Sequence, residues 1–326
     1  MPFRQTRCAA RRDRGKNMTE ENNGSGGTEP KRRWYLFYAV VVLGVGGFCY
    51  VLLQRQGLND SAALYLGVPL ILALGLSLLP ASKSAFGATM KGITIALLLS
   101  AFVFQEGYIC ILFAAPIFYA VGALVALPID AARARKEKPT IQTAAIVSIL
   151  ALLSLEGTTD LTTVSRDNEV TVSKIVEAPI EVVHGQLSKP PRFDGDKPAF
   201  LRIFPYPAAI SGRALQVGDE ERIVFVAYKH IWWTRVEGAL VLEVSALGPN
   251  GIKFVATGDD SYLSHYLEWK SSEVVLEPID AAHTRVTWIL AYRRILDPSW
   301  YFGVMQRYAV RLAAEELIDN VATPRD

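Results

Sequence analysis

The hydropathy of this chain changes abruptly near residue 156, and this change constrains the fold more than any other feature. Residues 34–155 are almost entirely apolar, whereas residues 160–326 mix apolar and charged side chains as a water-soluble domain does. The mean hydropathy of +0.22 therefore averages two unlike halves. The sequence predicts a membrane-embedded half followed by one domain of about 165 residues, which is long enough to form a packed core.

The apolar half predicts several membrane-spanning helices, because a helix needs about 20 mostly apolar residues to cross a bilayer. The five expected spans cover residues 34–53, 61–80, 85–104, 108–129 and 139–155. Only Gln105, Glu106 and Gly107 separate the third and fourth spans, which predicts a helical hairpin. Glu106 at membrane depth would suggest an ion or proton site, but a solvated turn at the interface is the simpler interpretation.

The basic residues predict the orientation of this half. Residues 1–33, which we interpret as a disordered tail, hold nine arginines and lysines against four acids; the chain could begin at Met1 or at Met18. An apolar span follows directly, so the tail is a topology signal rather than a nucleic-acid-binding arm. Five spans place the tail, Lys83 and the basic segment 130–140 on one side, which the positive-inside rule makes cytoplasmic.

The C-terminal domain then lies on the outer, periplasmic side of a cytoplasmic membrane. If the third and fourth spans together crossed only once, the domain would be cytoplasmic instead, and the basic segment 130–140 would lie outside against the same rule.

Cysteine and histidine usage argues against a metal centre or a bound cofactor in the domain. Cys8, Cys49 and Cys110 all precede it, so it has no thiolate ligands and no disulfides. None of the four histidines has a partner at helical metal-ligand spacing. The sequence also lacks a phosphate-binding loop and a nucleophile elbow.

The domain alternates short β-rich runs with turn signals, which predicts an antiparallel meander. Strands are expected at residues 169–178, 200–204, 221–228, 234–246, 252–258, 265–277 and 282–294. Helices are expected at residues 180–187 and 297–319, with Asp297 as the N-cap of the second and Pro298 at its first position. The apolar faces of the last strand and the last helix should cover each other.

Two segments carry a resemblance to a known family: VSKIVEAPIEVVHGQL at 172–187, and TRVTWILAYRRILDPSWYFGVMQRYAVRLAAEELI at 284–318. With the meander between them, residues 168–322 resemble the α+β helix-grip domain of the START-like (SRPBCC) superfamily, which includes the polyketide cyclase/dehydrase and lipid-transport group. Most members are soluble, so the apolar half departs from the family pattern. The resemblance implies a cavity between the sheet and the C-terminal helix that holds an apolar ligand.

By position, six side chains are candidates for the wall of that cavity. They are Trp269, Trp288, Tyr292, Tyr301, Met305 and Tyr308. The alternative is that they fill a core, as aromatic residues at strand or helical spacing commonly do.

His265, Tyr266 and Glu268 are weak candidates for catalysis because they share an expected strand. Tyr266 and Glu268 would lie on one face, opposite His265. If Glu268 were buried, its raised pKa would suit it to act as an acid or base on a cavity ligand. An ordinary solvated carboxylate is the alternative.

Trp232 and Trp233 interrupt two strands beside basic residues, as in loops that touch a membrane interface. Our hypothesis is that this loop contacts lipid headgroups and opens the cavity toward the bilayer. Alternatively, both tryptophans pack in the sheet.

Three functions remain open at this point. The leading hypothesis is a membrane-anchored domain that binds a lipid or another hydrophobic small molecule. The second is an enzyme of the cyclase or dehydratase type that uses cavity Tyr, Glu or His side chains. The third is a structural or partner-binding domain with a filled core. The expected partners are membrane lipids and an apolar small molecule, without nucleic acid, and the sequence identifies no protein partner.

Overall fold

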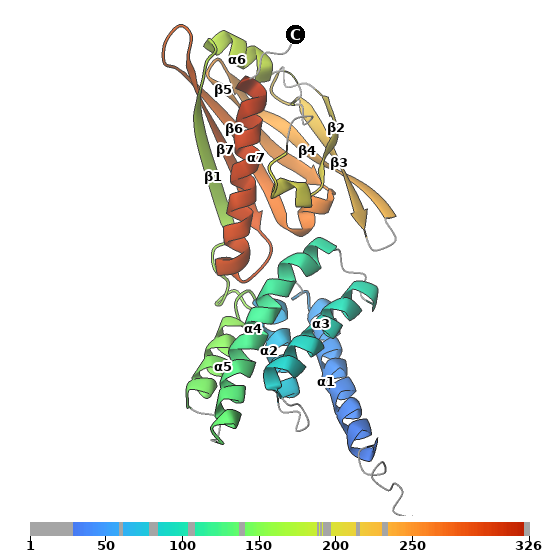
Figure 1. The fold of residues 1–326 in the computed structure, drawn as a ribbon. Helices are drawn as coiled ribbons and strands as arrows, with labels where there is room; N and C mark the ends of the chain where they lie inside the picture. The colour runs from blue at the N-terminus through green and yellow to red at the C-terminus, as the bar shows by residue number, and fades with distance from the viewer. Residues whose placement is uncertain are drawn as a thin grey trace, which may run out of the picture.

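The chain forms a group of apolar helices with a single α+β domain at one end (Figure 1). The computed structural model describes residues 29–58, 61–77, 84–103, 108–136, 141–187, 189, 191, 197–212, 216–229 and 234–322. Residues 1–28, most of the predicted tail, lie outside this part. Helix α1 already begins at Glu29, ahead of the first predicted span.

The N-terminal half consists of apolar helices. They are α1 (Glu29–Arg55), η1 (Ala63–Gly67), α2 (Val68–Ser77), α3 (Ala85–Val103), α4 (Tyr108–Ala134) and α5 (Ile141–Leu153). Their inward side chains form one continuous apolar core that also reaches the base of the domain.

The expectation of five full-length spans is wrong within the described residues. Two helices contain stretches long and apolar enough to cross a membrane, at Leu36–Leu53 and Ile109–Ala134. The apolar helices 63–77, 85–100 and 141–153 are shorter. Hydropathy overestimated the last of them because Leu155, counted in the fifth span, lies in a turn after α5 has ended.

Polar contacts join the end of α2, the start of α3 and the end of α4, on the side of the helical group that lies away from the domain. The Asp130 carboxylate accepts hydrogen bonds from the Ser84 hydroxyl at 2.7 Å and from the Ala85 backbone N–H at 2.6 Å. It thereby satisfies an N–H group that the first turn of α3 leaves without a helical partner. Arg133, near the end of α4, donates to the backbone carbonyl of Ser77.

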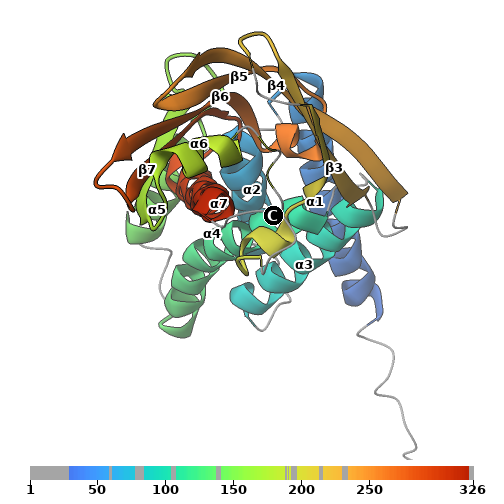
Figure 2. The same ribbon diagram turned by 90° about the horizontal axis from the view of Figure 1, so that it is seen from above.

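The domain contains one seven-stranded antiparallel sheet with the order β1-β7-β6-β5-β4-β3-β2. The strands are β1 (Asp167–Val176), β2 (Tyr206–Gly212), β3 (Glu220–Lys229), β4 (Thr234–Gly248), β5 (Gly251–Asp259), β6 (Leu267–Pro278) and β7 (Thr284–Arg294). The helical elements are α6 (Ile180–Leu187), η2 (Leu201–Ile203), η3 (Tyr262–His265), η4 (Ser299–Gly303) and α7 (Val304–Ala322). Viewed from above, the sheet curves around α7 (Figure 2). This arrangement confirms the predicted helix-grip fold.

Strand β7 and helix α7 cover each other, as their patterns predict. Every second residue of β7 is buried, which is the period of a strand with one face on a core. Opposite them, α7 presents residues three or four positions apart, the spacing of one helical face. The buried side chains of the apolar core in the two elements are Val286, Trp288, Leu290, Tyr292, Val310, Ala314, Ile318 and Val321.

Two expected strands differ from the structure. Residues 201–203 form a turn of 3-10 helix, and β2 begins only at Tyr206, after Pro205. His265 ends another 3-10 turn and β6 begins at Leu267, so the expected strand at 265–277 started two residues too early. In both places a compact turn buries apolar side chains that also fit a strand pattern.

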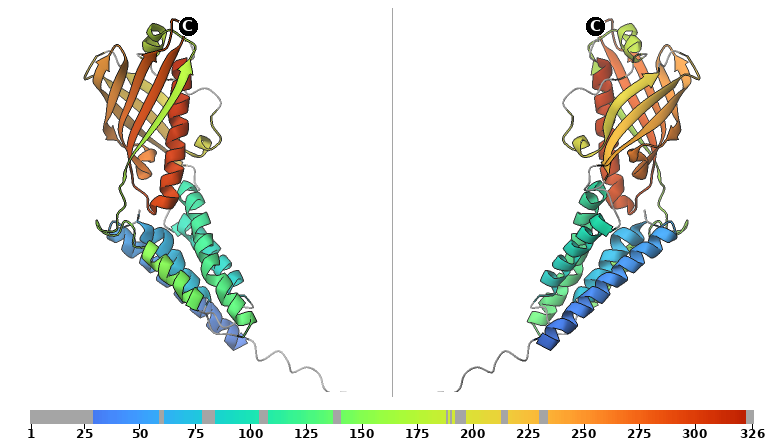
Figure 3. Two further views of the ribbon diagram at one scale, coloured as in Figure 1. Left: turned by 90° about the vertical axis from the view of Figure 1, so that its left-hand side faces the viewer. Right: turned by 90° about the vertical axis from the view of Figure 1, so that its right-hand side faces the viewer.

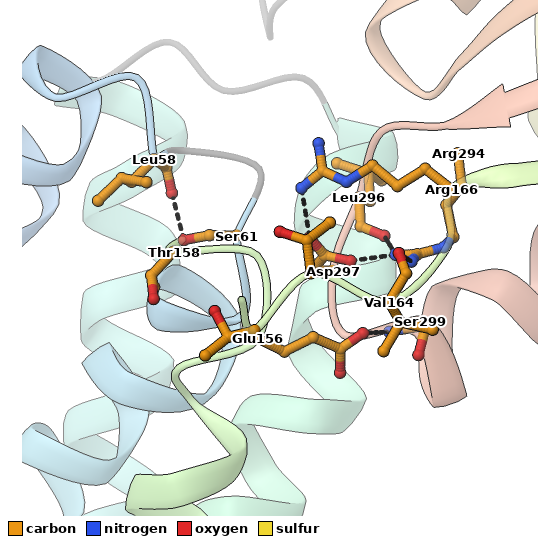
Figure 4. Close-up of polar contacts among 12 residues, drawn as sticks. Leu58, Ser61, Glu156, Thr158, Val164, Arg166, Arg294, Leu296, Asp297 and Ser299 are labelled. Atoms are coloured by element: carbon orange, nitrogen blue, oxygen red, sulfur yellow. Dashed lines mark hydrogen bonds and ion pairs between the residues drawn. The ribbon is translucent and has the colours of Figure 1, made fainter. Parts of the chain in front are cut away.

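Asp297 does not cap the last helix, which corrects a second expectation. Its carboxylate is fully buried and pairs with Arg294 and, at 2.6 Å, with Arg166 (Figure 4). Pro298 remains extended, and the helical segment begins at Ser299. The two guanidinium partners, of which Arg294 is buried, outweigh the weaker attraction of a capping site.

The same cluster fixes the domain to the helical half. The Glu156 side chain accepts a hydrogen bond from the Ser299 N–H at 2.8 Å (Figure 4), and its backbone carbonyl accepts one from the Ala62 N–H at 2.9 Å. Both side views show the domain at the end of the helical group opposite the N-terminus of α1 (Figure 3). The connection between α5 and β1 is therefore an ordered joint.

Candidate functional site

A cavity of about 240 Å³ lies between the curved sheet and helix α7. Its wall combines inward-facing residues of β3, β4, β6 and β7 with one face of α7 and the η2 turn. The apolar wall includes Leu201, Phe204, Ile223, Phe225, Leu240, Leu242, Phe254, Leu290, Ala309, Val310 and Ala313. A concave, mostly apolar space with a few polar groups is the usual form of a small-molecule site.

Three of the six predicted wall residues line this cavity: Trp269, Trp288 and Met305. The Trp288 indole N–H is already used, since it donates to the Ser272 hydroxyl at 2.9 Å. Trp288 is therefore a fixed part of the wall.

The other three predicted wall residues lie elsewhere. Tyr292 is buried in the core, where its ring packs edge-on against Trp269. The Tyr301 hydroxyl donates to the backbone carbonyl of Phe113 at 2.7 Å, which places this side chain at the junction with the helical half. Tyr308 lies on the outer face of α7 and is 51% exposed. The helical period groups Tyr301 and Tyr308 with Met305, but it does not determine which side of that helical face meets the sheet.

Glu221 lines the cavity but was not among the residues predicted from the sequence. Its side chain is only 5% exposed, and burial raises its pKa to about 7. No described residue makes a hydrogen bond or ion pair with its carboxylate. A signal was present, because period two along β3 places Glu221 on the same face as Ile223 and Phe225, which also line the cavity.

Other polar atoms in the wall also lack partners within the described residues. They are the Gln186 Oε1, the Gln306 Oε1 and the Trp269 Nε1, all of them buried. Gln306 is held in place through its other amide atom, since its Nε2 donates to the backbone carbonyl of Tyr266 at 2.7 Å. Buried polar atoms normally have partners, so these three and Glu221 offer hydrogen bonds to a molecule inside the cavity.

Tyr206 and Glu316 add a further polar group to this wall. Burial, and then the neighbouring Glu316 carboxylate, raise the pKa of the Tyr206 hydroxyl above its ordinary value. Lys197 lies 3.9 Å from the centre of the Tyr206 ring, a cation–π contact that holds the ring in place.

The predicted catalytic trio is not brought together. Glu268 is exposed and pairs with Lys270, so it is an ordinary solvated carboxylate. Tyr266 is buried, and burial raises the pKa of its hydroxyl, which lies 3.6 Å from the Cys110 sulfur. His265 faces away from the domain cavity, toward the helical half.

Two further expectations concern the loop with the paired tryptophans and the binding of a metal ion. Trp232 and Trp233 lie outside the described residues. Across the part of the chain that the structure describes, no group of three His, Cys, Asp or Glu side chains is arranged to hold a metal ion.

No protein-family model and no curated protein matches this sequence. Among solved structures, norcoclaurine synthase from Thalictrum flavum aligns at 9% identity and a TM-score of 0.34, over 49% of this chain and 94% of its own. A protein of Chromobacterium violaceum aligns at 14% identity and a TM-score of 0.33, over 48% and 94%. These neighbours have the Bet v 1-like or START-like fold. Because the scores are low, the fold assignment rests on the sheet order and the terminal helix described above.

Proposed function

We propose that this protein is a membrane-anchored domain that binds a lipid or another hydrophobic small molecule in the cavity beneath α7. The observation that carries the proposal is the open, apolar cavity with unpartnered polar atoms in its wall. Burial of the ligand would supply about 0.8 kcal/mol for each CH₂ group removed from water. The polar atoms would orient a ligand that has one hydrogen-bonding group.

The exterior of the helical half supports membrane anchoring. Large apolar side chains of α1, α3 and α4 are exposed there, among them Trp34, Phe37, Phe48, Leu98 and Leu127. Contiguous apolar surface of this kind marks an interface with a membrane or a partner. Helices α1 and α4 are long enough to span a bilayer, and the shorter helices pack against them.

The positions of the charges support a cytoplasmic N-terminus and a domain on the outer side. Arg133 and the start of α3 share the end of the helical group that lies away from the domain. Lys31, Arg32 and Arg33 lie in the first turns of α1, at the same end of the helical group. The positive-inside rule makes this end cytoplasmic.

A cavity-filling substitution tests the binding function. The full chain would be purified in detergent, extracted with organic solvent and analysed by mass spectrometry for a stoichiometric ligand. Ala313→Phe adds a ring to the cavity wall and should abolish that ligand, whereas Val304→Phe adds the same ring on the outer face of α7 and should retain it. An empty wild-type protein that also takes up no fluorescent fatty acid would contradict the proposal.

Glu221 favours one alternative function, an enzyme of the cyclase or dehydratase type. A carboxyl group with a pKa near 7 in an apolar cavity is well matched to proton transfer at neutral pH. In that case Glu221→Gln would still bind the extracted ligand but would no longer convert it, as judged by the loss of one water or by a change in its fragmentation pattern. Conversion at the wild-type rate by Glu221→Gln would exclude this role for Glu221.

A further inference from the structure

A second and larger cavity, of about 580 Å³, lies where the helical half meets the base of the domain. Helices α1 to α4 and η1 supply most of its wall, and the domain closes it with Ser264–Tyr266, Ile295 and Leu296. We call this space the junction cavity. Its volume is typical of small-molecule sites.

We propose that the junction cavity binds the acyl chain of a membrane lipid and is the entrance from the membrane half to the domain cavity. Binding in the junction cavity is independent of the function proposed above, whereas its role as an entrance rests on that function.

The polarity of the wall is graded along the cavity. Deep in the helical half the wall is apolar, with Leu43, Leu72 and Phe118. Its polar residues belong to the domain or to the helix ends nearest to it; they are Tyr50, Tyr65, Ser100, Cys110, Ser264, His265 and Tyr266. An amphipathic molecule would therefore lie with its chain among the helices and its polar end toward the domain.

The charge of the wall fits the uncharged part of a lipid. No Asp, Glu, Lys or Arg occurs among the described residues that line the junction cavity. A charged ligand would lose its hydration there without gaining an ionic partner, which is strongly unfavourable. A hydrocarbon chain with an ester group meets no such penalty.

The junction cavity reaches the apolar exterior of the helical half. Leu99 lines it and is also 46% exposed, next to the exposed Leu98 on α3. If this exterior faces lipid, an acyl chain can pass from the bilayer into the cavity without crossing water. Transfer from hydrocarbon to an apolar wall involves little change in solvation.

Tyr266 and Leu296 border both cavities. The Tyr266 side chain is buried at this position, and its hydroxyl contacts the Cys110 sulfur on α4. Gln306 binds the backbone carbonyl of the same residue from the α7 side. Movement of the Tyr266 ring away from Cys110 would join the two spaces, so this side chain is the partition between them.

Two glycines of α1 provide a matched pair of variants. A Cβ added at Gly47 or at Gly44 meets no atom within 4 Å, so a larger side chain is tolerated at either position. Gly47 lines the junction cavity, whereas Gly44 is exposed and does not. Gly47→Phe therefore occupies the cavity, and Gly44→Phe adds the same ring to the same helix outside it.

The experiment uses the full chain in phosphatidylcholine nanodiscs in which some of the lipid carries a diazirine in its acyl chain. After irradiation, mass spectrometry maps the labelled residues. The wild type and Gly44→Phe should be labelled at Ser264–Tyr266 as well as on the helix exterior. Gly47→Phe should lower the labelling of Ser264–Tyr266 by about tenfold, or about 1.4 kcal/mol of binding free energy, because its ring occupies the space that the acyl chain would fill. Equal labelling of this segment in Gly47→Phe, or none in the wild type, would overturn the proposal.

Ala313→Phe separates the two parts of the inference. This variant fills the domain cavity and should leave the labelling of Ser264–Tyr266 unchanged, even if the domain binds no ligand. Labels on the domain-cavity residues Leu240 and Leu290 should disappear in both Ala313→Phe and Gly47→Phe, because the second variant blocks the entrance. If Gly47→Phe leaves those domain labels intact, the junction cavity is not the entrance.

Discussion

Asp297 and Glu221 are both buried carboxylic acids of one domain, but their surroundings are opposite. Asp297, at the base of the domain, meets the guanidinium groups of Arg294 and Arg166. Glu221, in the cavity wall, meets no described cation, and burial alone raises its pKa to about 7. Two guanidinium groups balance the charge of Asp297, whereas burial without a cation disfavours the charged form of Glu221.

This contrast separates structure from function within the domain. A buried ion pair holds elements in a fixed arrangement, and removal of one partner is strongly unfavourable. A buried acid without a partner lowers stability at neutral pH, and groups of this kind cluster at functional sites. The predictions below test this distinction, from the largest expected effect to the smallest.

Asp297→Ala should lower the free energy of unfolding by about 3–5 kcal/mol, because it leaves the buried Arg294 without its partner. Thermal or urea unfolding of the full chain in detergent, followed by tryptophan fluorescence, measures the change. Asp280→Ala, which removes an exposed acid, is the control. A loss below about 1 kcal/mol would mean that the cluster contributes little beyond a surface ion pair.

The ionisation of Glu221 should make stability depend on pH. Its folded-state pKa of about 7 exceeds the ordinary value of 4.5, so the folded protein binds more protons between these values. The contribution of Glu221 to stability is therefore greatest below pH 4.5 and falls as the pH rises to 7, by roughly 3 kcal/mol in total. Unfolding of the wild type and of Glu221→Gln across this range measures the effect. The wild-type slope should be absent from the variant, and parallel profiles would assign it to other groups.

Gly157→Ala should destabilise the joint beside Asp297 by about 1–3 kcal/mol. Gly157 has a φ of +76°, and an added Cβ would lie 2.0 Å from the Asp297 Oδ2, which the two arginines hold in place. Gly185→Ala is the matched control, because its Cβ meets no atom within 4 Å and alanine favours the α6 helix. Unfolding measurements that rank the two variants equally would contradict the rigidity inferred for this site.

Glu268→Gln should change the free energy of unfolding by less than about 0.5 kcal/mol, because its ion pair with Lys270 is exposed. The same unfolding assay in low and high salt checks this value. A loss comparable to that of Asp297→Ala would show that pairing, rather than burial, determines the energetic role of the carboxylates.

The sequence predicted the domain fold well because its signals are local. Alternating residues define β7, Ala178-Pro179 precedes α6 at the expected residue, and turn residues separate the strands. The antiparallel order follows from short connections between successive strands. The number of full-length apolar spans was overestimated, since hydropathy does not distinguish apolar residues in helices from those in turns, such as Leu155.

The candidate site was predicted only in part because a cavity depends on contacts between distant segments. Trp269, Trp288 and Met305 were predicted from their positions in the fold that the family resemblance implies, and they line the cavity. Glu221 was missed, although its strand position held the signal, because an acid next to Glu220 at the start of a strand resembles a solvated pair. The junction cavity is formed by residues from opposite ends of the chain, which no local pattern connects.

The ordered joint between α5 and β1 limits how far the domain can reach. A domain on a long flexible linker could carry a bound molecule to a distant acceptor. Here Glu156, Gly157 and Arg166 are held against the base of the domain, so the cavity keeps one height and one orientation above the helices. In the proposed setting, any donor or acceptor of the ligand must come to this protein, and delivery to a second membrane requires a separate carrier.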